Sequence, residues 1–289
     1  MKFLLAAVNA KYIHSNLGIY SLKACADARM AGGPVEIELA EYTINHQPEQ
    51  VLQDIYRRRP EAVGFSCYIW NITYIEGLIR DLARLLPQTP IWLGGPEVSF
   101  DAEALLFREP DVDGIMRGEG EATFYELASA LLAAENGGEP ELSSIGGITF
   151  RTADGSIKEN PGRAPLPMDS LPFAYEDVTE FENRIIYYES SRGCPFSCSY
   201  CLSSVDKALR FRPISLVKRE LDWFLERKVP QVKFVDRTFN CKKSHALAIW
   251  RHILEHDNGV TNFHFEIAAD LLDEEAMELL EKMRPGLVQ

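Results

Sequence analysis

Short apolar runs alternate with helical stretches through the first half of this 289-residue chain, and that alternation limits the fold most strongly. The run at 2–9 is almost continuously apolar, which is typical of a central parallel strand buried on both faces. Alternation of this kind favours a Rossmann-like, doubly wound α/β sheet that binds its ligand at the carboxyl ends of the strands. The predicted strands are 2–9, 35–40, 62–68, 90–94 and 114–117, and the predicted helices are 17–30, 49–58, 72–86, 102–107 and 121–134.

The length of the chain favours two domains, because about 100–200 residues per domain is usual. We expect residues 1–140 to form the first domain. Residues 141–180 contain a hairpin around Asp154-Gly155 and a stretch with four prolines at 161–172, which predict a hairpin and an extended linker. The second domain is expected at 181–289.

Strands and helices also alternate in the second domain, which predicts the first part of a partial (β/α) barrel. The expected strands are 184–189, 231–236 and 262–268, and the expected helices are 214–228, 243–256 and a helix capped by Asp273 that runs to about residue 283. Residues 284–289 predict a turn and the start of a fourth strand. Since a barrel of about six or eight strands needs more repeats, we expect this chain to be part of a longer protein, with further pocket residues beyond Gln289.

Three cysteines, Cys194, Cys198 and Cys201, follow the strand at 184–189 with C-x3-C-x2-C spacing. Three thiolates can hold three irons of a cubane cluster, whereas simple electron carriers supply four. The fourth iron would therefore be open to a substrate or cofactor. A structural zinc site is the alternative, with Cys241 or His245 as fourth ligand, but the sequence has no second short knuckle of the usual zinc type. Cys241 is otherwise expected to be a buried small residue.

The segment from about Ile185 onward resembles the radical S-adenosylmethionine (radical SAM) superfamily, whose signature places an aromatic residue before the last cysteine, as Tyr200 is here. The resemblance implies a [4Fe–4S] cluster on the three cysteines and S-adenosylmethionine on the open iron. An electron from an external donor of the flavodoxin or ferredoxin type would cleave that cofactor. The resulting deoxyadenosyl radical would take a hydrogen atom from the substrate.

Members of that family hold the amino group of S-adenosylmethionine with a short polar segment after the second strand, and the corresponding segment here is 236–240. Its sequence differs from the usual Gly-Gly-Glu pattern. The resemblance implies that Asp236 contacts the amino group, helped by Arg237 or Asn240, and that Glu266 points into the barrel near the cofactor. A capped turn and a buried ion pair are the alternatives. Tyr200 completes the predicted S-adenosylmethionine-binding set.

The first half of the chain resembles the cobalamin-binding domain that precedes the radical SAM barrel in one large subgroup. The matching stretches, 64–68, 94–97 and 118–121, each come directly after a predicted strand. Glycine in such loops lets the backbone approach a flat ligand closely, and ordinary loop structure is the alternative. The predicted cobalamin-binding residues are Ser66, Gly94, Gly95, Gly118 and Glu119, with Ser66 bonding to the nucleotide tail.

Cobalamin methyltransferases with this fold place a histidine on cobalt through an Asp-x-His-x-x-Gly motif. The corresponding stretch here, 12–18, contains His14 but lacks the aspartate, and its glycine is displaced by one position. We therefore expect His14 to be a loop residue. Related radical SAM enzymes often dispense with that histidine, so cobalamin remains an expected cofactor whose lower face is unassigned.

Composition limits the partners and the compartment. Thirty basic and 43 acidic residues give a net charge of −13, which opposes binding to nucleic-acid phosphates. No apolar run reaches the roughly 18 residues of a membrane span, and the first residues do not form a signal peptide. We expect a cytoplasmic enzyme with a small-molecule substrate. A basic group, Lys207, Arg210 and Arg212, predicts either a local anion site or a solvated face.

The favoured function is methyl transfer from methylcobalamin to an unactivated carbon by a radical SAM enzyme. Radical rearrangement or oxidation without cobalamin is the second interpretation. A methylthiotransferase would require a second cluster domain and a basic face, and the sequence shows neither. A structural zinc or iron–sulfur module is the non-enzymatic alternative.

Overall fold

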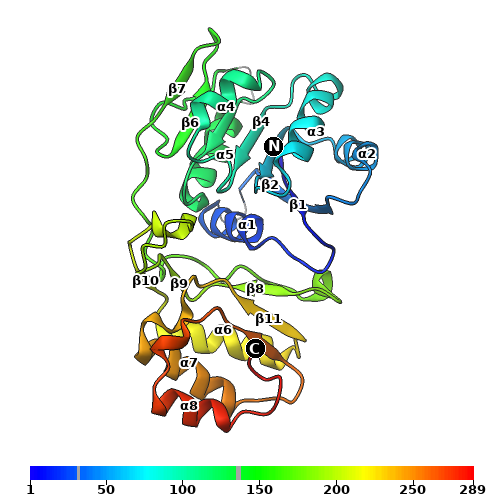
Figure 1. The fold of residues 1–289 in the computed structure, drawn as a ribbon. Helices are drawn as coiled ribbons and strands as arrows, with labels where there is room; N and C mark the ends of the chain where they lie inside the picture. The colour runs from blue at the N-terminus through cyan, green and yellow to red at the C-terminus, as the bar shows by residue number, and fades with distance from the viewer. Residues whose placement is uncertain (31–32, 135–137) are drawn as a thin grey trace. The chain divides into compact units, whose positions relative to one another are not determined.

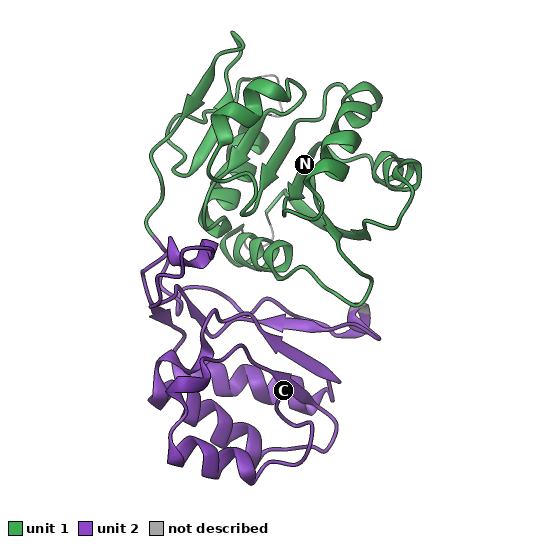
Figure 2. Ribbon diagram, in the orientation of Figure 1, with its two compact units in different colours: residues 1–164 green, residues 165–289 purple. Residues whose placement is uncertain are grey.

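The computed structural model describes residues 1–30, 33–134 and 138–289 (Figure 1). The chain divides into two compact units, residues 1–164 and 165–289 (Figure 2). Each unit has its own sheet. Among the described residues, no helix combines the length and the apolar character that crossing a membrane requires.

The first unit is built on one sheet with the strand order β2-β1-β3-β4-β5-β6-β7. Strands β1 to β5 are parallel, whereas β6 and β7 are antiparallel to their neighbours. The elements of this unit are β1 (Lys2–Asn9), α1 (Leu17–Met30), β2 (Glu36–Thr43), α2 (Pro48–Arg58), β3 (Ala62–Ser66), α3 (Ile72–Leu85), β4 (Ile91–Gly94), α4 (Ala102–Arg108), β5 (Gly114–Met116), α5 (Glu121–Ala134), β6 (Ile148–Arg151) and β7 (Ile157–Glu159).

The apolar run of β1 is buried on both faces, as its sequence predicts. Leu4, Ala6 and Val8 belong to a core cluster that they share with α2, α3 and α4. On the other face, the Phe3 ring packs edge-on against Phe124 of α5, with 4.9 Å between ring centroids, and α5 packs on α1. Helices therefore cover both faces, and the strand order reverses where β1 lies between β2 and β3. In doubly wound sheets such a reversal forms the ligand crevice at the carboxyl edge.

The boundary between the units differs from the predicted domains 1–140, 141–180 and 181–289. The hairpin of β6 and β7 belongs to the first sheet, because Ile148 pairs with Met116 and Phe150 pairs with Gly114. From residue 165 on, the proline-containing stretch packs within the second unit, where the Leu171 carbonyl oxygen accepts from Arg212 at 2.9 Å and the adjoining Phe173 ring lies 5.1 Å from the Trp223 ring. Backbone pairing and aromatic packing thus place most of the expected linker inside the two units.

The second unit contains a parallel sheet with the order β12-β11-β8, and α6, α7 and α8 lie on one side of it (Figure 1). Val288 adds an isolated parallel bridge to Phe263. The elements are β8 (Ile186–Tyr188), β9 (Ser191–Arg192), β10 (Arg210–Phe211), α6 (Ile214–Glu226), β11 (Gln231–Phe234), α7 (Lys243–Glu255), β12 (Asn262–His264) and α8 (Glu274–Glu281). Asp273 caps α8 as predicted, since its side chain accepts from the Ala276 amide.

Candidate functional site

The cysteine loop leaves the second sheet just past the carboxyl end of β8. Ser191 and Arg192 form β9, which pairs antiparallel with β10. Gly193 follows with φ +87°, and a Cβ there would lie 2.7 Å from the Ala208 carbonyl oxygen. The loop between β9 and β10 is therefore closed at its base by a tight backbone crossing that requires glycine.

The three motif cysteines are free thiols on this one loop. Cys194 is buried, and its Sγ lies 3.7 Å from Thr238 Oγ1. Cys198 is exposed and Cys201 half-buried, and the Cys201 amide donates to the Cys198 carbonyl oxygen at 3.1 Å. Hydrogen bonds from Ser203 lower the pKa of the Cys201 thiol. Since the thiolate is the form that binds metals, this donor set fits an iron–sulfur cluster.

His245 has a different role from that of a fourth zinc ligand. Its Nε2 lies 3.1 Å from Ser190 Oγ, whose only proton is donated to Asp236 Oδ1 at 2.7 Å. Nε2 must therefore carry a hydrogen and donate it to Ser190. Burial, together with Lys242, lowers the pKa of His245 to about 4, so the ring is neutral at neutral pH. Burial raises the pKa of the Cys241 thiol, which is partly buried.

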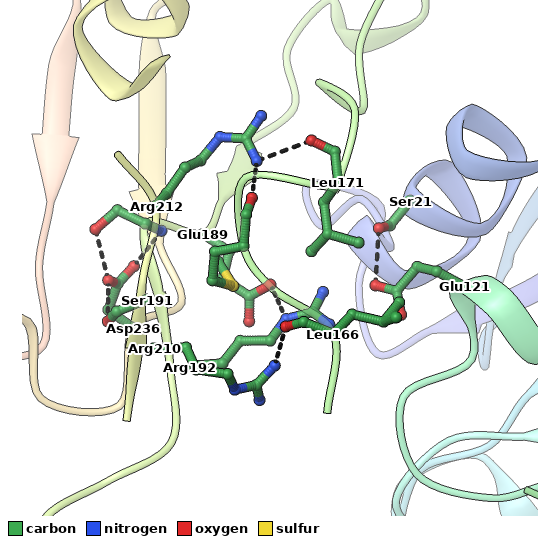
Figure 3. Close-up of polar contacts among 12 residues, drawn as sticks. Ser21, Glu121, Leu166, Leu171, Glu189, Ser191, Arg192, Arg210, Arg212 and Asp236 are labelled. Carbon is green, nitrogen blue, oxygen red and sulfur yellow. Dashed lines mark hydrogen bonds and ion pairs between the residues drawn. The ribbon is translucent and has the colours of Figure 1, made fainter. Parts of the chain in front are cut away.

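Asp236 lies beyond the end of β11 and is 1% exposed. Its carboxylate accepts three hydrogen bonds: from the Ser190 amide at 2.9 Å, from Ser190 Oγ at 2.7 Å and from Ser191 Oγ at 2.5 Å. Figure 3 shows Ser191 beside Asp236. Burial raises the pKa of this carboxyl, and the three hydrogen bonds oppose that shift. The side chain thus ties the end of β11 to the start of the cysteine loop. Its contact with the amino group of S-adenosylmethionine stays a prediction.

The other residues predicted to bind S-adenosylmethionine lie around the same sheet edge with different surroundings. The Glu266 side chain, 57% exposed, pairs with Lys233 at 3.0 Å, and this pairing lowers the pKa of its carboxyl. The side chain of Asn240 makes two hydrogen bonds to the Ala268 backbone. Its Nδ2 donates to the Ala268 carbonyl oxygen at 2.8 Å, and its Oδ1 accepts from the Ala268 amide at 2.9 Å. Arg237 is exposed, and Tyr200 is 91% exposed.

Arg212 is the most buried residue of the basic group after the cysteine loop, and it lies neither in an open anion site nor on a solvated face. Arg212 is 5% exposed and makes a two-pronged ion pair with the buried Glu220, through Nε at 2.7 Å and Nη2 at 2.5 Å. It also donates to the Leu171 carbonyl oxygen at 2.9 Å (Figure 3). Arg210 donates to the Leu166 carbonyl oxygen at 2.7 Å, and Lys207 bonds to Ser197 at 3.0 Å. These cations stabilise the loop and the segment beside it.

The carboxyl edge of the first sheet is organised by Glu41, which lies on β2. Its Oε1 accepts from Asn9 Nδ2 at 2.8 Å and from the Asn16 amide at 2.7 Å. Asn16 Nδ2 in turn lies 3.2 Å from Ser66 Oγ. This network places the predicted cobalamin ligand Ser66 beside the loop that carries His14. The carbonyl oxygen of His14 accepts from Asn9 at 3.0 Å, so the residue is part of the folded loop.

The two glycine loops after β4 and β5 are joined by Ser99. Its hydroxyl donates to the Gly95 carbonyl oxygen at 2.8 Å and accepts from the Gly118 amide at 3.2 Å. Gly94 ends β4, and the half-buried Glu119 follows Gly118. The five predicted cobalamin-binding residues therefore all lie at the carboxyl edge of one sheet.

Family comparison matches both halves of the chain. The B12 binding domain model matches residues 4–128, and the Radical SAM superfamily model matches residues 188–289. The chain is a radical SAM protein with an N-terminal B12-binding domain. The match confirms the predicted fold class, a doubly wound domain followed by a radical SAM region.

The chain is similar to the 2-(S-pantetheinyl)-carbapenam-3-carboxylate methyltransferase of Streptantibioticus cattleyicolor, with 28% identity over 62% of this chain and 28% of that protein. It is also similar to the anaerobic magnesium-protoporphyrin IX monomethyl ester cyclase of a Synechocystis species, with 32% identity over 58% of this chain and 32% of that protein. The structure of OxsB, a cobalamin-dependent S-adenosylmethionine radical enzyme, covers 97% of this chain with a TM-score of 0.75 and 18% identity, and this chain covers 41% of OxsB. The radical SAM protein thus spans less than half the length of these relatives.

Several residues that shape the two sites were not identified from the sequence. Glu41, Asn71 and Ser99 organise the B12-binding domain, and Ser190 organises the radical SAM domain. Asn71 is fully buried and donates to the carbonyl oxygens of Val8 and Ser66, each at 2.9 Å. None of these residues lies in a recognisable motif. The only local signal is that each lies in the last residues of a strand or in the loop that follows one, where polar residues at a buried edge need partners.

Replacing Gly95 by alanine is expected to destabilise the B12-binding domain more than the same change at Gly118. Both residues have positive φ, +108° and +72°, which costs an alanine roughly 1–2 kcal/mol. At Gly95 a Cβ would also lie 2.5 Å from the Cys67 carbonyl oxygen, whereas at Gly118 it would meet nothing within 4 Å. Urea unfolding followed by tryptophan fluorescence measures the difference. Equal losses at the two positions would show that the close contact with Cys67 does not constrain this loop.

Proposed function

We propose that this chain is the cofactor-binding part of a cobalamin-dependent radical SAM methyltransferase, which replaces a hydrogen on an unactivated carbon by a methyl group. The observation that carries the proposal is the presence, in one chain, of a three-thiol loop and a B12-binding domain. The methyltransferase among its relatives supports this choice of reaction.

Cys194, Cys198 and Cys201 are the proposed cluster ligands. The buried Cys194 is anchored by its amide, which donates to the Asp206 carbonyl oxygen at 3.0 Å, and the exposed Cys198 leaves the outer side of the loop accessible. When bound, the cluster and S-adenosylmethionine supply the radical chemistry that removes the hydrogen atom. The protein holds the thiolates in place through the backbone crossing at Gly193 and the network around Asp236.

Tyr200, Asp236 and Glu266 are the proposed contacts for S-adenosylmethionine. The exposed Tyr200 ring is free to cover an apolar part of the cofactor, and the Glu266 carboxylate offers a negative charge for its amino group. Asp236 is already surrounded by serine donors, so its main proposed role is to position the loop.

Ser66, Gly94, Gly95, Gly118 and Glu119 are the proposed cobalamin contacts, at the carboxyl edge of the first sheet. The loop after β3 adds apolar surface there, because Ile69 is 79% and Trp70 46% exposed, and the Trp70 ring stacks on Tyr68 with 4.4 Å between centroids. Flat apolar surface of this kind suits a corrin ring. A reductant of the flavodoxin or ferredoxin type and a reducing, cytoplasmic setting complete the proposal, supported by six cysteines of which three belong to the one motif.

Anaerobic binding of hydroxocobalamin to the full-length protein tests the proposal. We expect stoichiometric uptake that changes the corrin absorbance, and EPR of the cob(II)alamin form will show whether nitrogen occupies the lower face. His14→Gln should leave that spectrum unchanged, since the sequence around His14 lacks the ligand motif. Absence of uptake would contradict cobalamin-dependent methyl transfer.

Radical oxidation without methyl transfer is the second candidate, and the similarity to a cyclase favours it. The two reactions consume S-adenosylmethionine differently, because a methyl group taken from it leaves S-adenosylhomocysteine. Turnover of full-length protein that yields deoxyadenosine together with S-adenosylhomocysteine supports methyl transfer. Deoxyadenosine alone, with substrate converted, supports the oxidation.

A further inference from the structure

Two histidines and an aspartate lie together on α6 and α7, in the second unit. Asp222 belongs to α6, and His252 and His256 lie at the end of α7, one helical turn apart. One possible ligand atom from each of the three residues lies within 4.8 Å of the others. His252 Nε2 lies 2.6 Å from Asp222 Oδ1, and the two imidazole rings are 4.2 Å apart, tilted by 30°.

The hydrogen bonding of His256 leaves one ring nitrogen available. Its Nδ1 lies 2.9 Å from the His252 carbonyl oxygen, which can only accept, so Nδ1 carries the hydrogen. Nε2 of the neutral ring then has a free lone pair. Histidines that bind metals usually donate their other ring N–H to a carbonyl or carboxylate oxygen, which orients the ring. His256 already has this arrangement.

We propose that Asp222, His252 and His256 bind one divalent transition-metal ion, for which Zn²⁺ is the natural choice. Two imidazoles and a carboxylate are a common donor set for zinc, with a fourth position left for water. Binding replaces the hydrogen that His252 Nε2 donates to Asp222, and this proton leaves to solvent. The ion forms bonds to two nitrogens and one oxygen, and no oxidation or reduction occurs.

The three residues have the freedom that binding requires. Zinc bonds of about 2.0–2.2 Å place tetrahedral ligands roughly 3.3 Å apart, so Asp222 must move back from His252 by a fraction of an ångström. The Asp222 side chain is 41% exposed and His256 is exposed, whereas the His252 side chain is only 6% exposed. The buried His252 therefore acts as the fixed ligand and the two surface side chains adjust to the ion.

The position of the cluster in the fold separates it from the radical chemistry. In a βα unit each helix runs back against its strands, so the end of α7 lies near the amino end of β12, at the opposite edge from the cysteine loop. In parallel barrels the amino ends of the strands serve stability, and the carboxyl ends serve catalysis. An ion at this position would clamp α6 to α7, which pack together, and would stabilise the folded state by mass action.

A simple hydrogen bond between His252 and Asp222 is the competing explanation. It accounts for the 2.6 Å contact, and the bond from His256 Nδ1 to the His252 carbonyl oxygen orients the His256 ring under either explanation. Removing the His256 imidazole distinguishes the two explanations, because it leaves the hydrogen bond between His252 and Asp222 intact. Glu255, an exposed neighbour on the same helix, provides a matched control for loss of local charge or polarity.

The test is a Zn²⁺ titration against a chromophoric chelator, made anaerobically on the full-length protein with its iron–sulfur cluster loaded. A repeat in a variant with Cys194, Cys198 and Cys201 all changed to alanine excludes capture of zinc by thiols. We expect one Zn²⁺ per chain. His256→Gln should weaken its binding by more than about tenfold, the smallest loss usual for changing even an outer partner of a metal ligand, and Glu255→Gln should leave it unchanged.

Thermal unfolding gives the second measurement. Zn²⁺ should raise the unfolding temperature of the wild type and of Glu255→Gln but not that of His256→Gln. Absence of saturable binding in the wild type, or equal affinity in His256→Gln and the wild type, would overturn the proposal. Neither result depends on cobalamin uptake or on turnover, so the metal site and the proposed function are tested separately.

Discussion

Replacing Cys198 by alanine is expected to abolish the iron–sulfur cluster and, with it, all cleavage of S-adenosylmethionine. Two thiolates cannot hold a cubane that the motif binds through three. The fold should survive, because the Cys198 side chain is exposed and belongs to no core. Iron and acid-labile sulfide per chain after anaerobic reconstitution measure the first effect. Formation of deoxyadenosine in the presence of a reductant measures the second.

Cys241→Ala is the matched control for this experiment. Cys241 lies outside the motif, yet it is near enough to Cys194 for that thiol to contribute, after burial and Asp236, to the raised pKa of Cys241. The control should retain a full cluster. Unchanged cluster content in Cys198→Ala would refute the ligand assignment. Stoichiometric zinc in place of iron in anaerobically purified wild type would favour the structural zinc site instead.

Replacing Asp236 by alanine is expected to have the second largest effect, by disordering the start of the cysteine loop. The change leaves three buried donors without an acceptor: the Ser190 amide and the hydroxyls of Ser190 and Ser191. Each unsatisfied buried donor costs about 1–3 kcal/mol, so the total is at least about 3 kcal/mol. Reconstituted iron content should fall even without S-adenosylmethionine, and urea unfolding measures the loss of stability.

Asp236→Asn separates a positioning role from direct contact with the cofactor. The amide keeps one acceptor oxygen but turns an NH2 group toward a donor, so cluster content should fall partway. If Asp236 instead acts only by binding the amino group, iron content will be normal and the affinity for S-adenosylmethionine will drop. Asp270→Asn, an exposed aspartate in the same unit, controls for the loss of one charge.

The regular elements were predicted well because their signals are local. A parallel strand buried on both faces requires a nearly unbroken apolar run, as at residues 2–9, and each helix has its own periodicity. The ribbon of β9 and β10 was not predicted. Each strand has only two residues, and it pairs with residues that lie about 18 positions away in the sequence. The addition of β6 and β7 to the first sheet was missed because β6 pairs with β5, whose residues lie 32 to 36 positions earlier in the chain.

The site was predicted unevenly. The C-x3-C-x2-C spacing alone identified Cys194, Cys198 and Cys201 as candidate cluster ligands, because such a motif can be recognised before anything is known of its surroundings. The surroundings of Asp236 and Glu266 could not be distinguished in this way. Both follow a strand and both are acidic, but Asp236 is buried among serine donors, whereas the Glu266 side chain is 57% exposed beside a lysine.

The amino-acid sequence by itself determined the order of the longer strands and helices, the class of fold and the three-thiol motif, because each depends on residues close together in the chain. Only the tertiary structure decided which charges are buried, as in the pairing of Arg212 with Glu220. It also decided which distant side chains meet, as Asp222 and His252 do across 30 residues. Burial and hydrogen bonding depend on what packs around a group, and that neighbourhood exists only once the helices have docked on the sheet.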